Sequence, residues 1–66
     1  MNVRLRLQRK WSTLEWVVTV YFLRGGAYRR SEPDCYYTDC KEDAQGTQEQ
    51  MAKRFARNGY IVESLS

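Results

Sequence analysis

The sequence contains no histidine, only two cysteines and one proline, and no apolar run as long as a membrane-spanning helix. Without histidine, the commonest general base and metal ligand is absent, and no Ser or Cys has an imidazole to activate it. Two thiols alone cannot complete a tetrahedral zinc site. We therefore expect a protein that is not an enzyme and has no metal or cofactor.

The two cysteines, Cys35 and Cys40, lie close together in the chain. A disulfide-framework protein of this length usually carries about four or more cysteines. We predict reduced thiols, while a local disulfide and a site shared between two copies of the chain stay open.

The absence of an apolar span argues against a membrane protein, and the first ten residues alternate charged with apolar side chains, unlike a secretory signal. We expect a cytoplasmic protein with no membrane partner. Residues 1–66 are enough for a single small domain.

Charge is distributed unevenly along the chain. Residues 1–30 hold seven basic groups and one acidic group, whereas residues 31–66 hold four basic and seven acidic groups, giving +6 against −3. This asymmetry predicts a bipolar molecule that interacts with a charged partner.

A helix and a following strand are predicted in the C-terminal half. Asp39 with Glu42 fits an N-cap and its capping-box partner, and Asn58-Gly59 fits a helix end. Helical spacing aligns a stripe of side chains that should face the core: Ala44, Gln48, Met51, Ala52 and Phe55. The β-branched and aromatic residues after Gly59 predict a strand over residues 60–65.

Two strands are predicted in the N-terminal half. Apolar residues alternate with polar ones from Val3 to Leu7, which predicts an edge strand, and the alternative is a basic arm at residues 1–10 that orders only on a partner. Residues 14–23 predict the central strand of the sheet. One of its faces should lie under the helix: Leu14, Trp16, Val18, Val20 and Phe22.

Gly25-Gly26 is a turn signal, because both residues can adopt positive φ. A two-residue loop would place Phe22 opposite Arg29, and polar groups would then lie on the buried side. We therefore expect a polar, partly irregular ribbon over residues 28–34, regaining strand character at residues 35–37.

Together these elements predict an α+β fold, a small antiparallel sheet with one helix packed on one face, in (β)ββαβ order. We expect the strand over residues 60–65 to lie beside the strand over residues 14–23. The helix is expected to form part of the core through Met51 and Phe55, together with Ile61 or Val62.

The strong strand over residues 14–23, the segment Tyr36-Tyr37-Thr38-Asp39 and the segment from Asn58 to Glu63 carry a resemblance in topology. In order and length they resemble very short phage-encoded β-β-helix-β proteins, among them small phage inhibitors of bacterial RNA polymerase and some phage antitoxins. The resemblance implies a phage or mobile-element protein that binds a bacterial machine and blocks or redirects it. Some of those inhibitors are markedly acidic, so no binding residue is transferred.

Exposed Arg and Tyr are the residue types enriched in binding hot spots, and they mark the candidate site. The candidate binding residues are Arg24, Tyr28, Arg29, Arg30, Arg4, Arg6 and Tyr21. The first hypothesis is a protein-binding regulator or inhibitor whose partner is a bacterial host protein with an acidic surface. The alternative is a nucleic-acid-binding module in which arginines contact phosphates and tyrosines stack on bases. Association of two copies also stays open.

Overall fold

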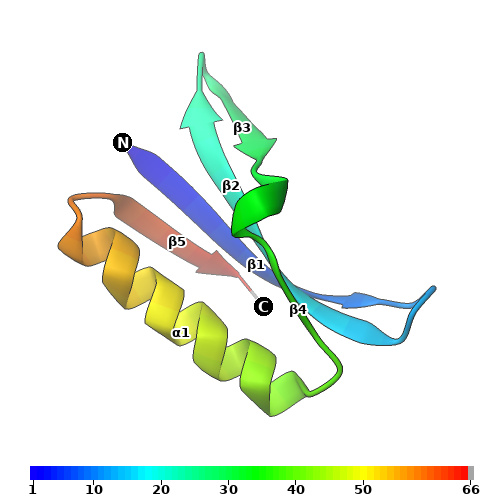
Figure 1. The fold of residues 1–66 in the computed structure, drawn as a ribbon. Coiled ribbons are helices and arrows are strands. Elements are labelled where there is room, and N and C mark those ends of the chain that lie inside the picture. The colour runs from blue at the N-terminus through cyan, green and yellow to red at the C-terminus, as the bar shows by residue number, and fades with distance from the viewer. Residues whose placement is uncertain (66) are drawn as a thin grey trace.

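The computed structural model describes residues 1–65, in which one helix packs on one face of a single sheet (Figure 1). The elements are β1 (Asn2–Lys10), β2 (Glu15–Arg24), β3 (Ala27–Arg30), the short 3₁₀ helix η1 (Glu32–Asp34), β4 (Tyr36–Thr38), α1 (Lys41–Arg57) and β5 (Ile61–Leu65). The predicted α+β fold, with a mostly antiparallel sheet and one helix on one face, is confirmed.

The strand order is β3-β2-β1-β5, and β4 also pairs with β2. β1 is antiparallel to β2 and parallel to β5. β3 and β4 occupy the same edge of β2, at Tyr21–Arg24 and Trp16–Val18 respectively, and η1 lies between them in the chain. One long strand therefore pairs with two short ones on its outer side.

The prediction that residues 1–10 form an edge strand or a flexible arm is wrong, because β1 lies inside the sheet. Figure 1 shows it between β5 and β2. Val3 and Leu5 are fully buried and Leu7 is nearly so. The period-2 pattern correctly separated a buried face from a wet face, but it contains no information on how many neighbours a strand has.

The predicted position of the last strand, beside residues 14–23, is also wrong. β5 pairs with β1, where Val3 aligns with Val62. The outer edge of β2 is already occupied by β3 and β4, so the free edge of β1 is the one that remains for β5. The helical crossover from β4 to β5 consequently spans two strands.

The β2–β3 hairpin has the tight two-residue loop that the sequence analysis rejected. Gly25 and Gly26 have φ of 58° and 82°, as a type I′ turn requires, and Phe22 does face Arg29. Arg29 stays exposed, so the pairing buries no charge. The predicted irregularity is confined to residues 31–35, around η1, and strand pairing resumes at Tyr36.

Helix α1 begins one residue later than predicted, and the Asp39 N-cap is wrong. Cys40 is the N-cap, without a side-chain hydrogen bond, and its backbone N–H donates to Thr38 Oγ1 at 3.2 Å. The predicted end at Asn58-Gly59 is confirmed: Gly59 has φ of 87°, and Tyr60 N donates to Phe55 O at 3.0 Å. The positive φ of Gly59 and this hydrogen bond are the features of a Schellman motif.

The core lies between α1 and the face of the sheet that β1 and β2 present to it. Its members from the sheet are Val3, Leu5, Leu7, Trp16, Val18, Val20, Phe22, Tyr36 and Val62, those from α1 are Ala44, Met51, Ala52 and Phe55, and Tyr60 joins them from the connection between α1 and β5. The predicted faces of residues 16–22 and of the helix are confirmed. Of the two predicted alternatives, Ile61 and Val62, it is Val62 that packs in the core, since Ile61 is 68% exposed. Leu14 lies outside β2, exposed and with φ of 58°.

Candidate functional site

The face of the sheet opposite α1 is covered by no other helix or strand of residues 1–65, and we call it the open face. Strand alternation and register define its members. They are Asn2, Arg4, Arg6, Gln8 and Lys10 of β1, Glu15, Val17, Thr19, Tyr21 and Leu23 of β2, Tyr28 and Arg30 of β3, Tyr37 of β4, and Ile61, Glu63 and Leu65 of β5. Five of the seven predicted binding residues lie here.

The strand register brings three predicted residues into one row across the sheet. Arg4 aligns with Tyr21 on one side and with Glu63 on the other, and Tyr21 aligns with Arg30. Arg4 Nε forms an ion pair with the Glu63 carboxylate, and its guanidinium carbon lies 4.0 Å from the centre of the Tyr28 ring. These side chains form a continuous polar and aromatic surface over four strands.

Arg6 occupies the next position of β1 on this face. It is exposed and forms no ion pair within the part of the chain that the structure describes. Its charge is thus available to a partner.

The structure separates the other two predicted residues from this surface. Arg29 pairs with Phe22, and Arg24 pairs with Ala27 beside the turn, so both lie on the α1 side of the sheet. Both are exposed, at the end of the hairpin. Residues 24–30 therefore contribute side chains to both faces of the sheet. Which residue lies on which face depends on the register that the two-residue turn sets.

Arg30 belongs to a ring of hydrogen bonds with Glu32 and Tyr37. Arg30 Nε donates to Glu32 Oε2 at 2.8 Å and Arg30 Nη2 donates to Tyr37 Oη at 2.7 Å, while Tyr37 Oη donates to Glu32 Oε1 at 2.5 Å. The hydrogen bond from Tyr37 lowers the pKa of Glu32, and the same bond raises the pKa of Tyr37. Arg30 is therefore held by two partners within the fold.

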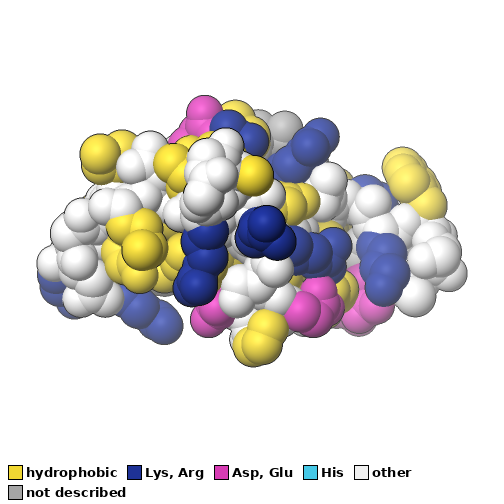
Figure 2. All heavy atoms as spheres, turned by 90° about the horizontal axis from the view of Figure 1, so that it is seen from above, with side chains coloured by type: hydrophobic (Ala, Val, Ile, Leu, Met, Phe, Trp, Pro, Cys, Tyr) yellow, Lys and Arg dark blue, Asp and Glu magenta, His cyan; other side chains and the backbone are white. Residues whose placement is uncertain are grey.

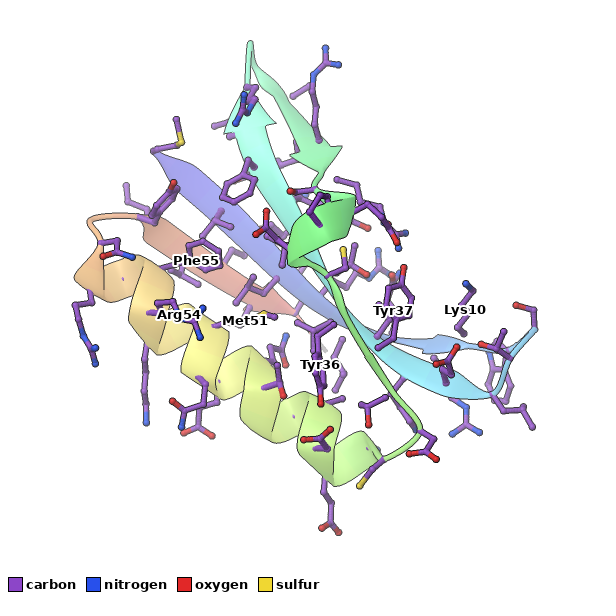
Figure 3. All side chains as sticks on the ribbon, in the orientation of Figure 1. Lys10, Tyr36, Tyr37, Met51, Arg54 and Phe55 are labelled. Carbon is purple, nitrogen blue, oxygen red and sulfur yellow. The ribbon has the colours of Figure 1, made fainter. Side chains whose placement is uncertain are left out.

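A pocket of about 220 Å³ lies beside this ring. It is lined by Gln8, Arg9, Lys10, Val17, Arg30 and Tyr37. Figure 3 shows Lys10 next to Tyr37, and its Nζ lies 5.4 Å from the centre of that ring. The sequence analysis assigned no role to Gln8 or Tyr37, although the alternation of β1 places Gln8 on the same face as Arg4 and Arg6.

The open face mixes both signs of charge. Its cations are Arg4, Arg6, Lys10 and Arg30, and its carboxylates are Glu15, Glu63 and the Glu32 that Arg30 binds; four against three leaves +1. Figure 2, which shows the molecule from above, has dark blue cations close to magenta carboxylates and yellow apolar groups on the surface in view. The bipolar molecule expected from the sequence is thus partly neutralised, because folding brings acidic residues of the second half to the basic first half.

A second, larger groove of about 590 Å³ lies between α1 and β4. Tyr36 forms one wall, and its hydroxyl donates to Asp43 Oδ2 at 2.6 Å, while Gly46 and Met51 contribute from the helix. Figure 3 shows Tyr36 between β4 and α1, on the opposite side of the sheet from Tyr37. None of the predicted binding residues lines this groove.

Both cysteines are free thiols; Cys35 is half-buried and Cys40 is exposed. Within residues 1–65, no cluster of three or more His, Cys, Asp or Glu side chains is arranged to hold a metal ion. No helix in that range is both long and apolar enough to cross a membrane.

No protein-family model, no curated protein and no solved structure matches this chain.

Proposed function

We propose that this protein is a non-enzymatic binding module whose open face docks on an acidic surface of a protein partner. Arg and Tyr are the residue types that contribute most at protein interfaces, and the arrangement of Arg4, Tyr21, Tyr28 and Arg30 on one face is the observation that carries the proposal. We further propose a phage or mobile-element regulator or inhibitor that acts on a macromolecular machine in the bacterial cytoplasm. The order of its strands and helix, which resembles small phage proteins, supports this role.

The intramolecular contacts of the open face favour a protein partner over a nucleic acid. Arg4 and Arg30 are held by Glu63 and Glu32, and each of those carboxylates would lie near a phosphate backbone docked on the same surface. A net charge of +1 over the whole face provides little counterion release. A protein surface can instead offer carboxylates to Arg6 and donors to Glu63, so it can satisfy both signs.

A nucleic acid is the second candidate, because half-exposed Tyr21 and Tyr28 lie on the same face as the unpaired Arg6. Aromatic rings on a sheet can stack with bases, and a neighbouring cation can bind a phosphate. Titration of single- and double-stranded oligonucleotides at several salt concentrations tests this candidate. No detectable binding at low salt would eliminate it.

The protein-binding proposal is tested by affinity capture from a bacterial lysate with two matched charge reversals. Arg6→Glu changes the open face, whereas Arg29→Glu makes the same change on the opposite side of the neighbouring hairpin, and both residues are exposed. A captured partner is expected to bind Arg6→Glu at least about tenfold more weakly than wild type, which is about 1.4 kcal/mol. Arg29→Glu should bind it nearly as well as wild type.

The outcomes of this capture separate the alternatives. Loss of binding in Arg29→Glu but not in Arg6→Glu would move the site to the other side of the hairpin. If no protein is retained above a control of scrambled charge, the protein-binding function is refuted. Circular dichroism of both variants verifies that the fold is intact.

A further inference from the structure

We propose that the pocket between Gln8, Lys10, Arg30 and Tyr37 is an oxyanion site, and that it binds a carboxylate or phosphoryl group carried by the protein partner. The pocket has a volume of about 220 Å³ and lies on the open face. The inference rests on the proposed function for the source of the anion, but binding of a free anion needs no partner.

The floor of the pocket is rigid and its position is fixed by strand pairing. Val17 is 95% buried and lies between Gln8 of β1 and Tyr37 of β4, which align with it from the two sides. Three adjacent strands thus hold the opposite walls at a set separation. A site whose walls belong to paired strands loses little conformational entropy when it binds a ligand.

One wall presents an amide donor that the fold leaves unused. Thr19 Oγ1 donates to Gln8 Oε1 at 3.1 Å. This bond orients the side-chain amide of Gln8 and uses its oxygen within the protein. Within residues 1–65, Gln8 Nε2 has no hydrogen-bond acceptor. Thr19 itself is fully buried, so it holds the Gln8 amide from the side away from solvent. An anion is the ligand class that accepts from such a donor beside a cation.

The charges around the pocket leave an excess of positive charge. Arg30 is neutralised by Glu32, but Lys10 forms no ion pair with any described residue. Arg9 also contributes to the lining, but it aligns with Trp16 on the α1 side, and its guanidinium carbon lies 5.0 Å from the centre of that ring. Lys10 Nζ is therefore the free charge that an incoming oxyanion would neutralise.

The ring of hydrogen bonds explains why this excess persists in the folded protein. The two carboxylate oxygens of Glu32 already accept from Arg30 Nε and Tyr37 Oη. Glu32 is consequently held by Tyr37 and Arg30, and the charge of Lys10 acts on it only as a minor cause of its lowered pKa, while the ammonium of Lys10 lies over the ring of Tyr37. The geometry leaves Lys10 beside a concave, donor-lined surface; Glu15 aligns with it across the strands but forms no ion pair with it within residues 1–65.

The site is tested by NMR titration with inorganic phosphate and, separately, with acetate, each at constant ionic strength. We expect saturable shifts of the Gln8 side-chain amide and of the backbone amides of Lys10, Val17 and Tyr37. Gln8→Glu keeps an acceptor for Thr19 but introduces a negative charge, and it should weaken anion binding at least about tenfold. Gln45→Glu makes the same change at an exposed helix position and should leave binding unchanged.

A second variant, Lys10→Met, removes the free charge while leaving the length of the side chain, and should also weaken binding. Stronger binding of phosphate than of acetate would indicate a phosphoryl group on the partner, and the reverse would indicate an Asp or Glu side chain. Shifts that do not saturate with either anion, or equal weakening by Gln45→Glu, would overturn the proposal. If the anions do not bind but a partner is still captured in an Arg6-dependent manner, only the anion-site proposal is refuted. If the anions bind saturably but no partner is captured, only the proposed protein-binding function is refuted.

Discussion

The guanidinium carbon of Arg4 lies 4.0 Å from the centre of the Tyr28 ring, although β2 separates the strands to which the two residues belong. The same guanidinium binds the carboxylate of Glu63 on β5. One side chain of β1 therefore connects both outer parts of the sheet across the open face. Such a connection holds the arginine in a single position before a partner arrives, which reduces the entropy lost on binding.

This relationship predicts measurable coupling between Arg4 and Tyr28. In a double-mutant cycle of Arg4→Met and Tyr28→Leu, the coupling free energy of unfolding should be about 0.5–1 kcal/mol, because the pair is partly exposed to solvent. Chemical denaturation of the four proteins gives this value. The pair Arg29→Met and Tyr28→Leu serves as the control, since Arg29 lies on the other face. Coupling no larger than in the control would show that the stacking does not contribute.

Phe55 is one of the helix residues that hold α1 on the sheet. Its ring packs edge-on against Phe22 at 5.7 Å and against Tyr60 at 5.2 Å. We expect Phe55→Ala to lower the free energy of unfolding by about 3 kcal/mol, since it removes both aromatic contacts and leaves a cavity. Thermal and urea denaturation provide the measurement. Arg57→Ala, at an exposed position two residues further, should change stability by less than about 0.5 kcal/mol.

A wild-type-like melting curve for Phe55→Ala would contradict the packing of α1 on the sheet. The opposite result, a chain that does not fold at all, is compatible with the small size of the domain, because a domain of this size has only a few kcal/mol of net stability. Phe55→Leu then provides a graded version of the same test.

Local patterns predicted which side chains face the core, but they did not predict which strands are neighbours. Alternation in Val3, Leu5 and Leu7 and the helical spacing of Met51 and Phe55 follow from geometry within one element, and the structure confirms both faces. Pairing of β5 with β1 depends instead on which edge is left free by β3 and β4. That competition involves the whole chain, so no single stretch encodes it.

The candidate site shows the same difference between what local patterns predict and what depends on strand pairing. Residue type alone selected Arg4, Tyr21 and Arg30, and the register then placed them in one row. Gln8 was missed because it is neither Arg nor Tyr, and Tyr37 because it was assigned only to a strand; their importance arises only where three strands meet. Alternation from Arg4 could have put Gln8 on the same face, but no local signal relates it to Tyr37.

Gly46 lies in the interior of α1 without a structural reason for being glycine. A Cβ at this position would meet no atom within 4 Å, and its φ is not in the left-handed region. Gly46→Ala should therefore stabilise the fold by about 1 kcal/mol, since alanine lowers the entropy of the unfolded chain and is the best helix former. Thermal denaturation should show a higher Tm.

Gly59→Ala is the matched control for this change. A Cβ at Gly59 also meets nothing within 4 Å, but φ is +87°, so alanine there is strained by the backbone alone. It should destabilise by about 1 kcal/mol, because the Schellman motif requires the left-handed conformation. If Gly59→Ala also raises Tm, the left-handed conformation of Gly59 and the end of α1 at Asn58 are assigned incorrectly; if Gly46→Ala lowers Tm, the prediction for Gly46 alone is wrong.

The ring of Arg30, Glu32 and Tyr37 predicts a dependence on pH. Its largest effect on Glu32 is the hydrogen bond donated by Tyr37, which lowers the pKa of the carboxyl group in the folded state. A lowered folded-state pKa means that the ionised group stabilises the fold above the unfolded value of about 4.3. This contribution is lost as the pH falls through the lower, folded-state pKa.

Tyr37→Phe removes the donor while keeping the ring, so the pKa of Glu32 should rise toward its ordinary value in that variant. NMR titration of the Glu32 carboxyl carbon measures this pKa directly in both proteins. Tyr36→Phe is the control, because Tyr36 donates to Asp43 on the other side of the sheet and should leave Glu32 unchanged. Equal pKa values for Glu32 in wild type and Tyr37→Phe would mean that Arg30 alone holds the carboxylate, and the wall of the anion pocket would then lack its fixed tyrosine.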